Sequence, residues 1–123
     1  MRIGTWNVEY AYPARLDALR AVLAANQADI WVLTETHDDL QPSQCEFVAH
    51  TEPRPKNWSG IRPGSRWVSI WGRFPILANV TLSTADKERT IAVLLDIGQS
   101  RKLIVYGTVM PWKGDRRIQD WSE

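Results

Sequence analysis

The sequence has few of the features that mark secreted, membrane-spanning or disulfide-stabilised proteins. Its 123 residues contain one cysteine, Cys45, so no disulfide can form within the chain and a reducing compartment is favoured. No apolar run approaches the roughly 20 residues of a membrane span, and no basic stretch followed by an apolar run opens the chain as in a signal peptide. We therefore expect a cytoplasmic protein with no membrane partner.

The sequence also lacks a large excess of charge of one sign. Its formal net charge is +1, with 44% hydrophobic and 24% charged residues, which is ordinary for a globular domain. A strong basic field of the kind that holds nucleic acid non-specifically is therefore excluded. Any nucleic-acid partner would have to be held by local positive groups.

The predicted fold is organised around two apolar segments that each end in a polar residue. Residues 2–8 read as a buried strand that delivers Asn7, and residues 29–35 read as a second that delivers Glu35. Residues 13–27 between them carry leucines and a valine at helical spacing. Strands joined by a crossover helix are usually parallel, so both polar ends should open onto one edge of the sheet, where open α/β sheets bind ligands.

The remainder of the chain predicts mostly antiparallel strands. Apolar and alternating segments indicate strands at residues 46–50, 66–72, 76–83, 90–97 and 102–108, and the start of a second helix at 116–123. The last two strands are joined by Gly-Gln-Ser-Arg and should form a hairpin. The predicted fold is α/β, with a mixed, mostly antiparallel sheet, one crossover helix and a truncated second helix.

Asn7 and Glu35 are the candidate metal ligands. An amide oxygen and a carboxylate are hard oxygen donors, the type that Mg²⁺ prefers. The alternatives are ordinary: Asn7 caps a turn, and Glu35 is a solvated carboxylate at a strand end. The position of both residues at neighbouring strand ends favours the metal site.

The same two segments resemble a known family. Thr-Trp-Asn-Val at residues 5–8, followed by Leu-Thr-Glu-Thr at residues 33–36, resembles the endonuclease/exonuclease/phosphatase superfamily, which has the deoxyribonuclease I-like fold. The resemblance implies that residues 1–123 are a partial domain, truncated at the C-terminus, and form one sheet-and-helix half of a four-layered α/β sandwich. It also implies that Asn7 and Glu35 help to bind a catalytic Mg²⁺ or Mn²⁺.

The resemblance further implies a metal-dependent phosphoester hydrolase, either a phosphodiesterase or nuclease or a phosphatase. Its substrate would be a phosphate ester, with nucleic acid among the candidates. In the family an Asp activates water and a His supports the phosphoryl charge, but the motifs that carry them have no match here. Val109 stands where many members have a His or Tyr near the phosphate.

Two alternatives to an active enzyme stay open. One is a non-catalytic half-fold that acts as a binding or scaffold piece, and the other is an inactive fragment of the enzyme. Because the predicted sheet has no second sheet to pack against, we expect an exposed apolar face. That face predicts self-association or pairing with the missing C-terminal half.

A second group of possible metal ligands follows Glu35 directly. Glu35, His37 and Asp39 could form a local cluster, but an exposed acidic loop is the favoured interpretation because no other ligand is fixed nearby.

The long irregular stretch at residues 51–65 carries basic and aromatic residues. Arg54, Lys56 and Arg62 with Trp58 suit phosphate contact and base stacking. A solvated loop rich in proline and glycine is the more ordinary interpretation, and it is favoured.

Overall fold

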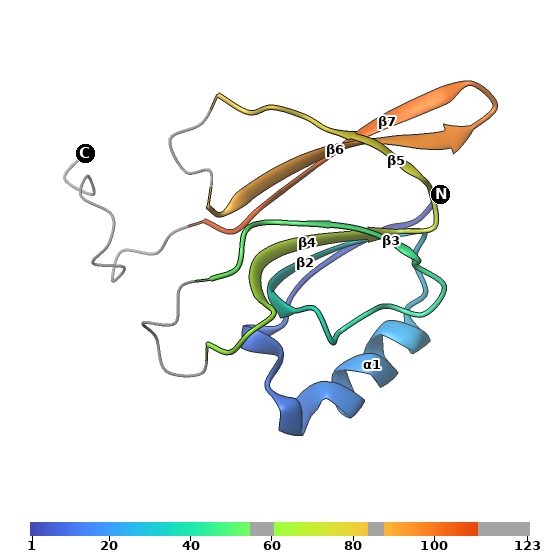
Figure 1. The fold of residues 1–123 in the computed structure, drawn as a ribbon. Coiled ribbons are helices and arrows are strands. Elements are labelled where there is room, and N and C mark those ends of the chain that lie inside the picture. The colour runs from blue at the N-terminus through green and yellow to red at the C-terminus, as the bar shows by residue number, and fades with distance from the viewer. Residues whose placement is uncertain (55–60, 84–87, 111–123) are drawn as a thin grey trace.

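The described part of the chain folds into three layers, a helix and two stacked sheets (Figure 1). The structure is a computed structural model, and it describes residues 1–54, 61–83 and 88–110. No helix in these ranges is both long and apolar enough to cross a membrane.

The first sheet has four strands in the order β1-β2-β4-β3. Their bounds are Ile3–Asn7 for β1, Ile30–His37 for β2, Phe47–His50 for β3 and Ser65–Gly72 for β4. β1 and β2 are parallel, as the crossover helix requires, and the other pairs are antiparallel. The predicted strand–helix–strand unit is confirmed.

The crossover helix is shorter than the helix predicted at residues 13–27. Two 3-10 turns, Glu9–Ala11 and Pro13–Arg15, precede α1, which runs from Leu16 to Ala25. Leu19 and Leu23 of α1 are buried in the cluster that also holds residues from the neighbouring face of the first sheet, Trp31, Leu33 and Trp71. The helix therefore covers one face of that sheet and leaves the other for the second sheet.

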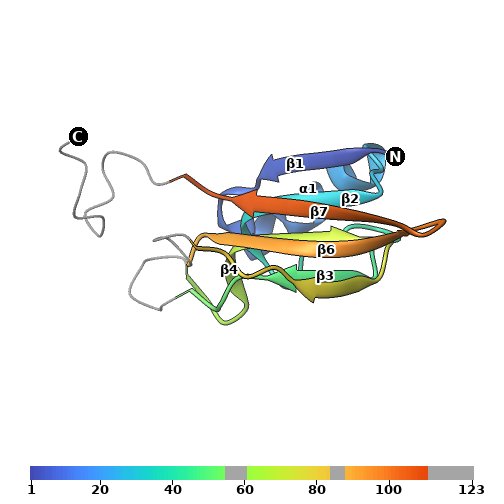
Figure 2. The same ribbon diagram turned by 90° about the horizontal axis from the view of Figure 1, so that it is seen from above.

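The second sheet has three antiparallel strands in the order β5-β6-β7. They are β5 (Ile76–Asn79), β6 (Thr90–Gly98) and β7 (Arg101–Thr108), and β6 and β7 form the predicted hairpin. Figure 2 shows β6 and β7 lying over the first sheet, with β1 at the border of that sheet. Between the sheets lies the larger cluster of apolar side chains, which includes Ile30, Val32, Ile70, Val93, Leu95 and Val105.

The second sheet corrects one prediction. We expected the first sheet to lack a partner and to expose an apolar face, which is wrong because β5, β6 and β7 cover that face. The exposed apolar residues on β7 are instead Ile104 and Tyr106, which are 60% and 55% exposed. The predicted second helix, at residues 116–123, lies outside the described residues.

The two sheets pack in close contact at Gly107 of β7. A Cβ atom there would lie 2.7 Å from Cγ1 of Val68 and 3.0 Å from Cγ1 of Val32. Valine side chains are stiff about χ1, so the methyl groups cannot move aside without shifting the strands. The absence of a side chain at Gly107 is therefore a condition of the packing between the sheets.

We predict that Gly107→Ala lowers the free energy of unfolding by about 1–3 kcal/mol, the usual cost of overpacking a core. Urea unfolding of both proteins measures it. Gly72→Ala in β4 is the matched control, because its Cβ would meet nothing closer than 3.7 Å. Equal stability of the Gly107→Ala and unsubstituted proteins would contradict this account of the sheet packing.

Candidate functional site

The parallel pairing of β1 with β2 forms the candidate site. The register pairs Asn7 with Thr34, so the last residue of β1 lies beside β2 one position before Glu35. The backbone N–H of Val8 donates to the carbonyl oxygen of Thr34 at 3.0 Å, which continues the ladder past Asn7. The predicted parallel pairing of the two strands is confirmed. However, β2 continues to His37, so Glu35 lies within the strand and not at its end as predicted.

The Asn7 side chain already makes one local hydrogen bond. Its Oδ1 accepts from the backbone N–H of Glu9 at 3.0 Å, so Asn7 does cap a turn, as the ordinary interpretation predicted. An amide oxygen has two lone pairs, and the residue is exposed. The hydrogen bond fixes the direction of the amide without using all of its acceptor capacity.

Glu35 has an unusual backbone for a strand residue. Its φ is +49°, in the left-handed region, which costs a non-glycine residue of the order of 1–3 kcal/mol, and such residues cluster at functional sites. Within residues 1–54, 61–83 and 88–110 its carboxylate makes no hydrogen bond or ion pair. Glu35 is therefore a half-buried carboxylate with no described partner for its charge.

Asn7 and Glu35 offer the right kind of ligand atom for a divalent cation, but they are only two protein ligands. Both donors are oxygen, as Mg²⁺ requires, and Mg²⁺ usually keeps several waters when it binds. Among the residues that the structure describes, no three His, Cys, Asp or Glu side chains gather closely enough to hold a metal ion. Asn7 and Glu35 would therefore hold a cation only together with waters or further ligands.

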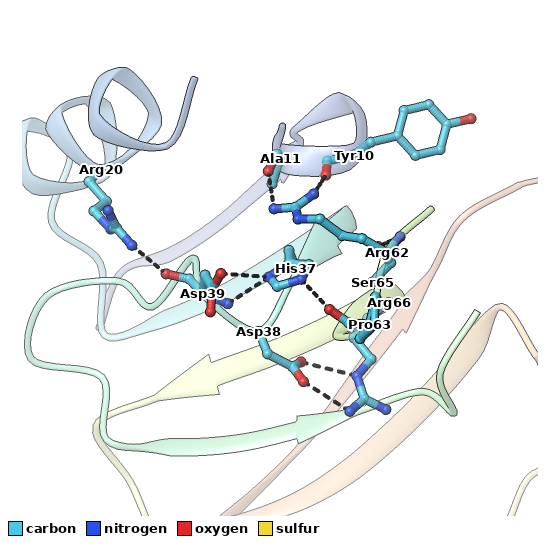
Figure 3. A network of polar contacts seen from close by, with 10 residues as sticks. All are labelled: Tyr10, Ala11, Arg20, His37, Asp38, Asp39, Arg62, Pro63, Ser65 and Arg66. Atoms are coloured by element: carbon cyan, nitrogen blue, oxygen red, sulfur yellow. Dashed lines mark hydrogen bonds and ion pairs between the residues drawn. The ribbon is translucent and has the colours of Figure 1, made fainter. Parts of the chain in front are cut away.

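The alternative cluster of Glu35, His37 and Asp39 is not a metal site in the described structure. His37 is buried, and both of its ring nitrogens have protein partners (Figure 3). Its Nε2 lies 2.6 Å from the carbonyl oxygen of Pro63, and its Nδ1 lies 3.0 Å from the backbone N of Asp39. Because each ring nitrogen already faces a protein partner, neither is left for a cation.

Asp38 is also taken up by a structural contact. Both of its carboxylate oxygens accept hydrogen bonds from Arg66, each at 3.0 Å, and Arg66 also donates to the carbonyl oxygen of Thr51. Burial raises the pKa of the Asp38 carboxyl, but the hydrogen bond and charge of Arg66, helped by His50 and His37, outweigh it and hold the pKa below its usual range. The pair ties the end of β2 to β4.

Arg54 and Arg62 of the 51–65 stretch contact other parts of the protein, so the prediction that they lie in a solvated loop is wrong for these two residues. Arg62 donates from Nη1 to the carbonyl oxygen of Tyr10 at 3.3 Å and from Nη2 to that of Ala11 at 2.7 Å. Arg54 is 5% exposed, and its guanidinium lies 3.5 Å from the ring centroid of Trp67. Lys56 and Trp58 lie outside the described residues.

Comparison with known proteins agrees with this architecture. Residues 4–122 match the family model described as the endonuclease/exonuclease/phosphatase family. An endonuclease/exonuclease/phosphatase from Beutenbergia cavernae DSM 12333 superposes with a TM-score of 0.67 at 20% identity, covering 93% of this chain and 39% of that one. The endonuclease domain of TRAS1, a telomere-specific non-LTR retrotransposon, superposes with a TM-score of 0.57 at 11% identity, covering 89% of this chain and 46% of that one. No curated protein matches the chain.

The fold and the comparisons first define a class, the α/β sandwich of these nuclease and phosphatase domains. The chain itself belongs to the endonuclease/exonuclease/phosphatase family, because the family model covers nearly all of it. It spans less than half the length of the two similar structures.

We predict that Asp38→Asn lowers the free energy of unfolding at pH 7 by roughly 1 kcal/mol, the upper end for a partly exposed ion pair of good geometry. A carboxyl whose pKa is lowered on folding stabilises the protein above its unfolded pKa of about 3.9 and loses this effect as the pH falls through the folded value. Urea unfolding from pH 7 to pH 2 should therefore show the difference shrinking below pH 4. Asp17→Asn, at an exposed pair with Arg20, is the control, and a deficit independent of pH would contradict the assignment.

Proposed function

We propose that this chain contributes the Asn7 and Glu35 half of the active site of a metal-dependent phosphoester hydrolase. The observation that supports the proposal is the parallel register of β1 and β2, which pairs Asn7 with Thr34, the residue before Glu35, in a member of this family. The left-handed backbone of Glu35 supports it.

Each residue has a distinct role in the proposed site. Glu35 supplies the negative charge that faces the cation, and Asn7 supplies a neutral oxygen, directly or through water. A bound Mg²⁺ or Mn²⁺ would neutralise charge on the phosphate and help to place the attacking water. Val109, whose backbone N–H donates to the carbonyl oxygen of Arg89, has no side-chain group for proton transfer. No described residue of this chain is assigned as the general base or as the phosphate-stabilising group.

The substrate class is a phosphate ester. The TRAS1 neighbour is an endonuclease domain, but its 11% identity supports the fold alone, and the net charge of +1 does not favour nucleic acid over a smaller ester.

We place the protein in the cytoplasm on the basis of its single cysteine, Cys45, which is buried and unpaired in the described structure. We also keep self-association or pairing with the rest of the domain as a proposal, through the apolar outer face of β7.

One observation favours the alternative of a non-catalytic scaffold piece. Asn7 Oδ1 is already bonded to Glu9, and the described residues supply no third ligand. A scaffold needs neither a divalent cation nor an ionised Glu35, so removal of that charge separates the two functions.

We predict that Glu35→Gln in the intact protein lowers metal-dependent phosphodiester hydrolysis by at least about a hundredfold, because it removes the charge that faces the cation and the transition state. The shape of the side chain is kept, so circular dichroism and the unfolding midpoint should change little. The assay compares hydrolysis of a generic phosphodiester with Mg²⁺ and with a chelator.

The control for this prediction is Glu46→Gln. Glu46 is exposed and precedes β3, whose first residue pairs with Gly72 at the opposite end of the sheet from Glu35. Its activity should equal that of the unsubstituted protein. A folded Glu35→Gln protein with undiminished activity would show that Glu35 is not the metal ligand.

A further inference from the structure

The turn that follows Asn7 is held in a backbone conformation that its residues disfavour. Glu9, Tyr10 and Ala11 have φ values of +47°, +70° and +45°, and none of them is glycine. Left-handed conformations are rare for such residues singly and more so in succession. A run of three persists only where surrounding contacts determine it.

Arg62 supplies two of those contacts. Its guanidinium donates to the carbonyl oxygens of Tyr10 and Ala11, at 3.3 Å and 2.7 Å (Figure 3). The planar fork of an arginine suits two acceptors with a fixed separation. The first residue of the same turn, Glu9, donates its N–H to Asn7 Oδ1, so the conformation that Arg62 stabilises also directs the Asn7 amide.

Arg62 is itself anchored to the end of β2. It opens a tight turn in which the Ser65 N–H donates to the Arg62 carbonyl oxygen at 3.0 Å and the Arg62 N–H donates to Ser65 Oγ at 3.1 Å. His37 holds this turn through its Nε2 contact with the carbonyl oxygen of Pro63. Gly64, with φ of +91°, lies so close to the His37 ring that a Cβ would approach it to 2.8 Å.

A second contact path joins the same two strand ends. The Arg54 guanidinium lies 4.8 Å from the ring centroid of Tyr10 and 3.5 Å from that of Trp67. Trp67 lies between the ladder pairs Thr34–Val68 and Thr36–Arg66, and hence across from Glu35. Both paths run from the turn after Asn7 to the strand pair that carries Glu35.

We propose that Arg62 is a positioning residue that sets the Asn7 amide relative to the Glu35 carboxylate, acting through the left-handed turn at residues 9–11 and anchored by His37. The effect on catalysis rests on the proposed function, but the geometric part does not. His37 is thereby assigned a role as the anchor of Arg62, in place of metal ligation.

The first test is Arg62→Met, which keeps side-chain length and removes every donor. Metal-dependent hydrolysis by the intact protein should fall by about tenfold to a hundredfold, as for other residues that orient a ligand. The loss should lie in kcat and in the Mg²⁺ concentration needed for half-activity, with KM for the ester nearly unchanged. Arg62→Lys should recover part of the loss, because an ammonium can still donate. Arg101→Met, at the exposed β6–β7 hairpin, should be fully active.

The second test asks whether Arg62 acts through Asn7. If it does, Arg62→Met combined with Asn7→Ala should be no less active than Asn7→Ala alone, because the group to be positioned is gone. A merely structural arginine would lower activity by the same factor in both backgrounds. Multiplying losses would overturn the proposal.

The third test needs no activity and separates this inference from the proposed function. The Asn7 side-chain amide should give one pair of well-dispersed ¹H–¹⁵N signals with restricted motion, and Arg62→Met should make it mobile and average its shifts. If the unsubstituted protein hydrolyses nothing and this change still occurs, the proposed function fails and the positioning role stands. If Arg62→Met does not fold, Arg62→Ala, which also removes every donor, carries the same measurement. An Asn7 amide that is equally restricted in the folded variant would overturn the proposal.

Discussion

The parallel hydrogen-bonded pairing of β1 with β2 is the constraint on which the rest of this structure depends. It requires a crossover, which α1 supplies, and it fixes Asn7 beside Thr34 of β2. The burial of Leu33 and Trp31 against α1 and of Ile30 and Val32 against the second sheet holds β2 at the centre of the molecule. A slip of one residue would exchange these two faces, so the core specifies the register that forms the candidate site.

Most of the charged side chains near the candidate site already have protein partners. His37, Asp38, Arg62 and Arg66 are each engaged with protein partners, and Arg54 packs on Trp67. These contacts hold the connections that follow β1, β2 and β3 against one another. Glu35 differs from these residues, because its charge has no partner among the described residues and its backbone is left-handed. In the proposed site, a divalent cation would supply the positive charge that balances Glu35.

Sequence patterns predict the parts of this structure that depend on local periodicity. The leucines of α1, the apolar run of β2 and the hairpin between β6 and β7 were identified from spacing alone, and the motif pair around Asn7 and Glu35 indicated the family. The second sheet was missed, because an apolar strand carries no mark of the sheet it joins. The left-handed residues were missed because none of them is glycine. Arg54 and Arg62 were expected in a solvated loop because the stretch is rich in proline and glycine, whereas their actual partners lie far away in the sequence.

The most direct test of the central claim is the location of a bound paramagnetic ion. Mn²⁺ added in small amounts to the ¹⁵N-labelled intact protein broadens the amide signals nearest to it. If Asn7 and Glu35 hold the cation, the signals of Asn7, Val8, Glu35 and Thr36 should broaden first and should recover on addition of excess Mg²⁺. Broadening centred on Asp38 and Asp39 or on Glu52 and Glu88, or none near the ends of β1 and β2, would contradict the account.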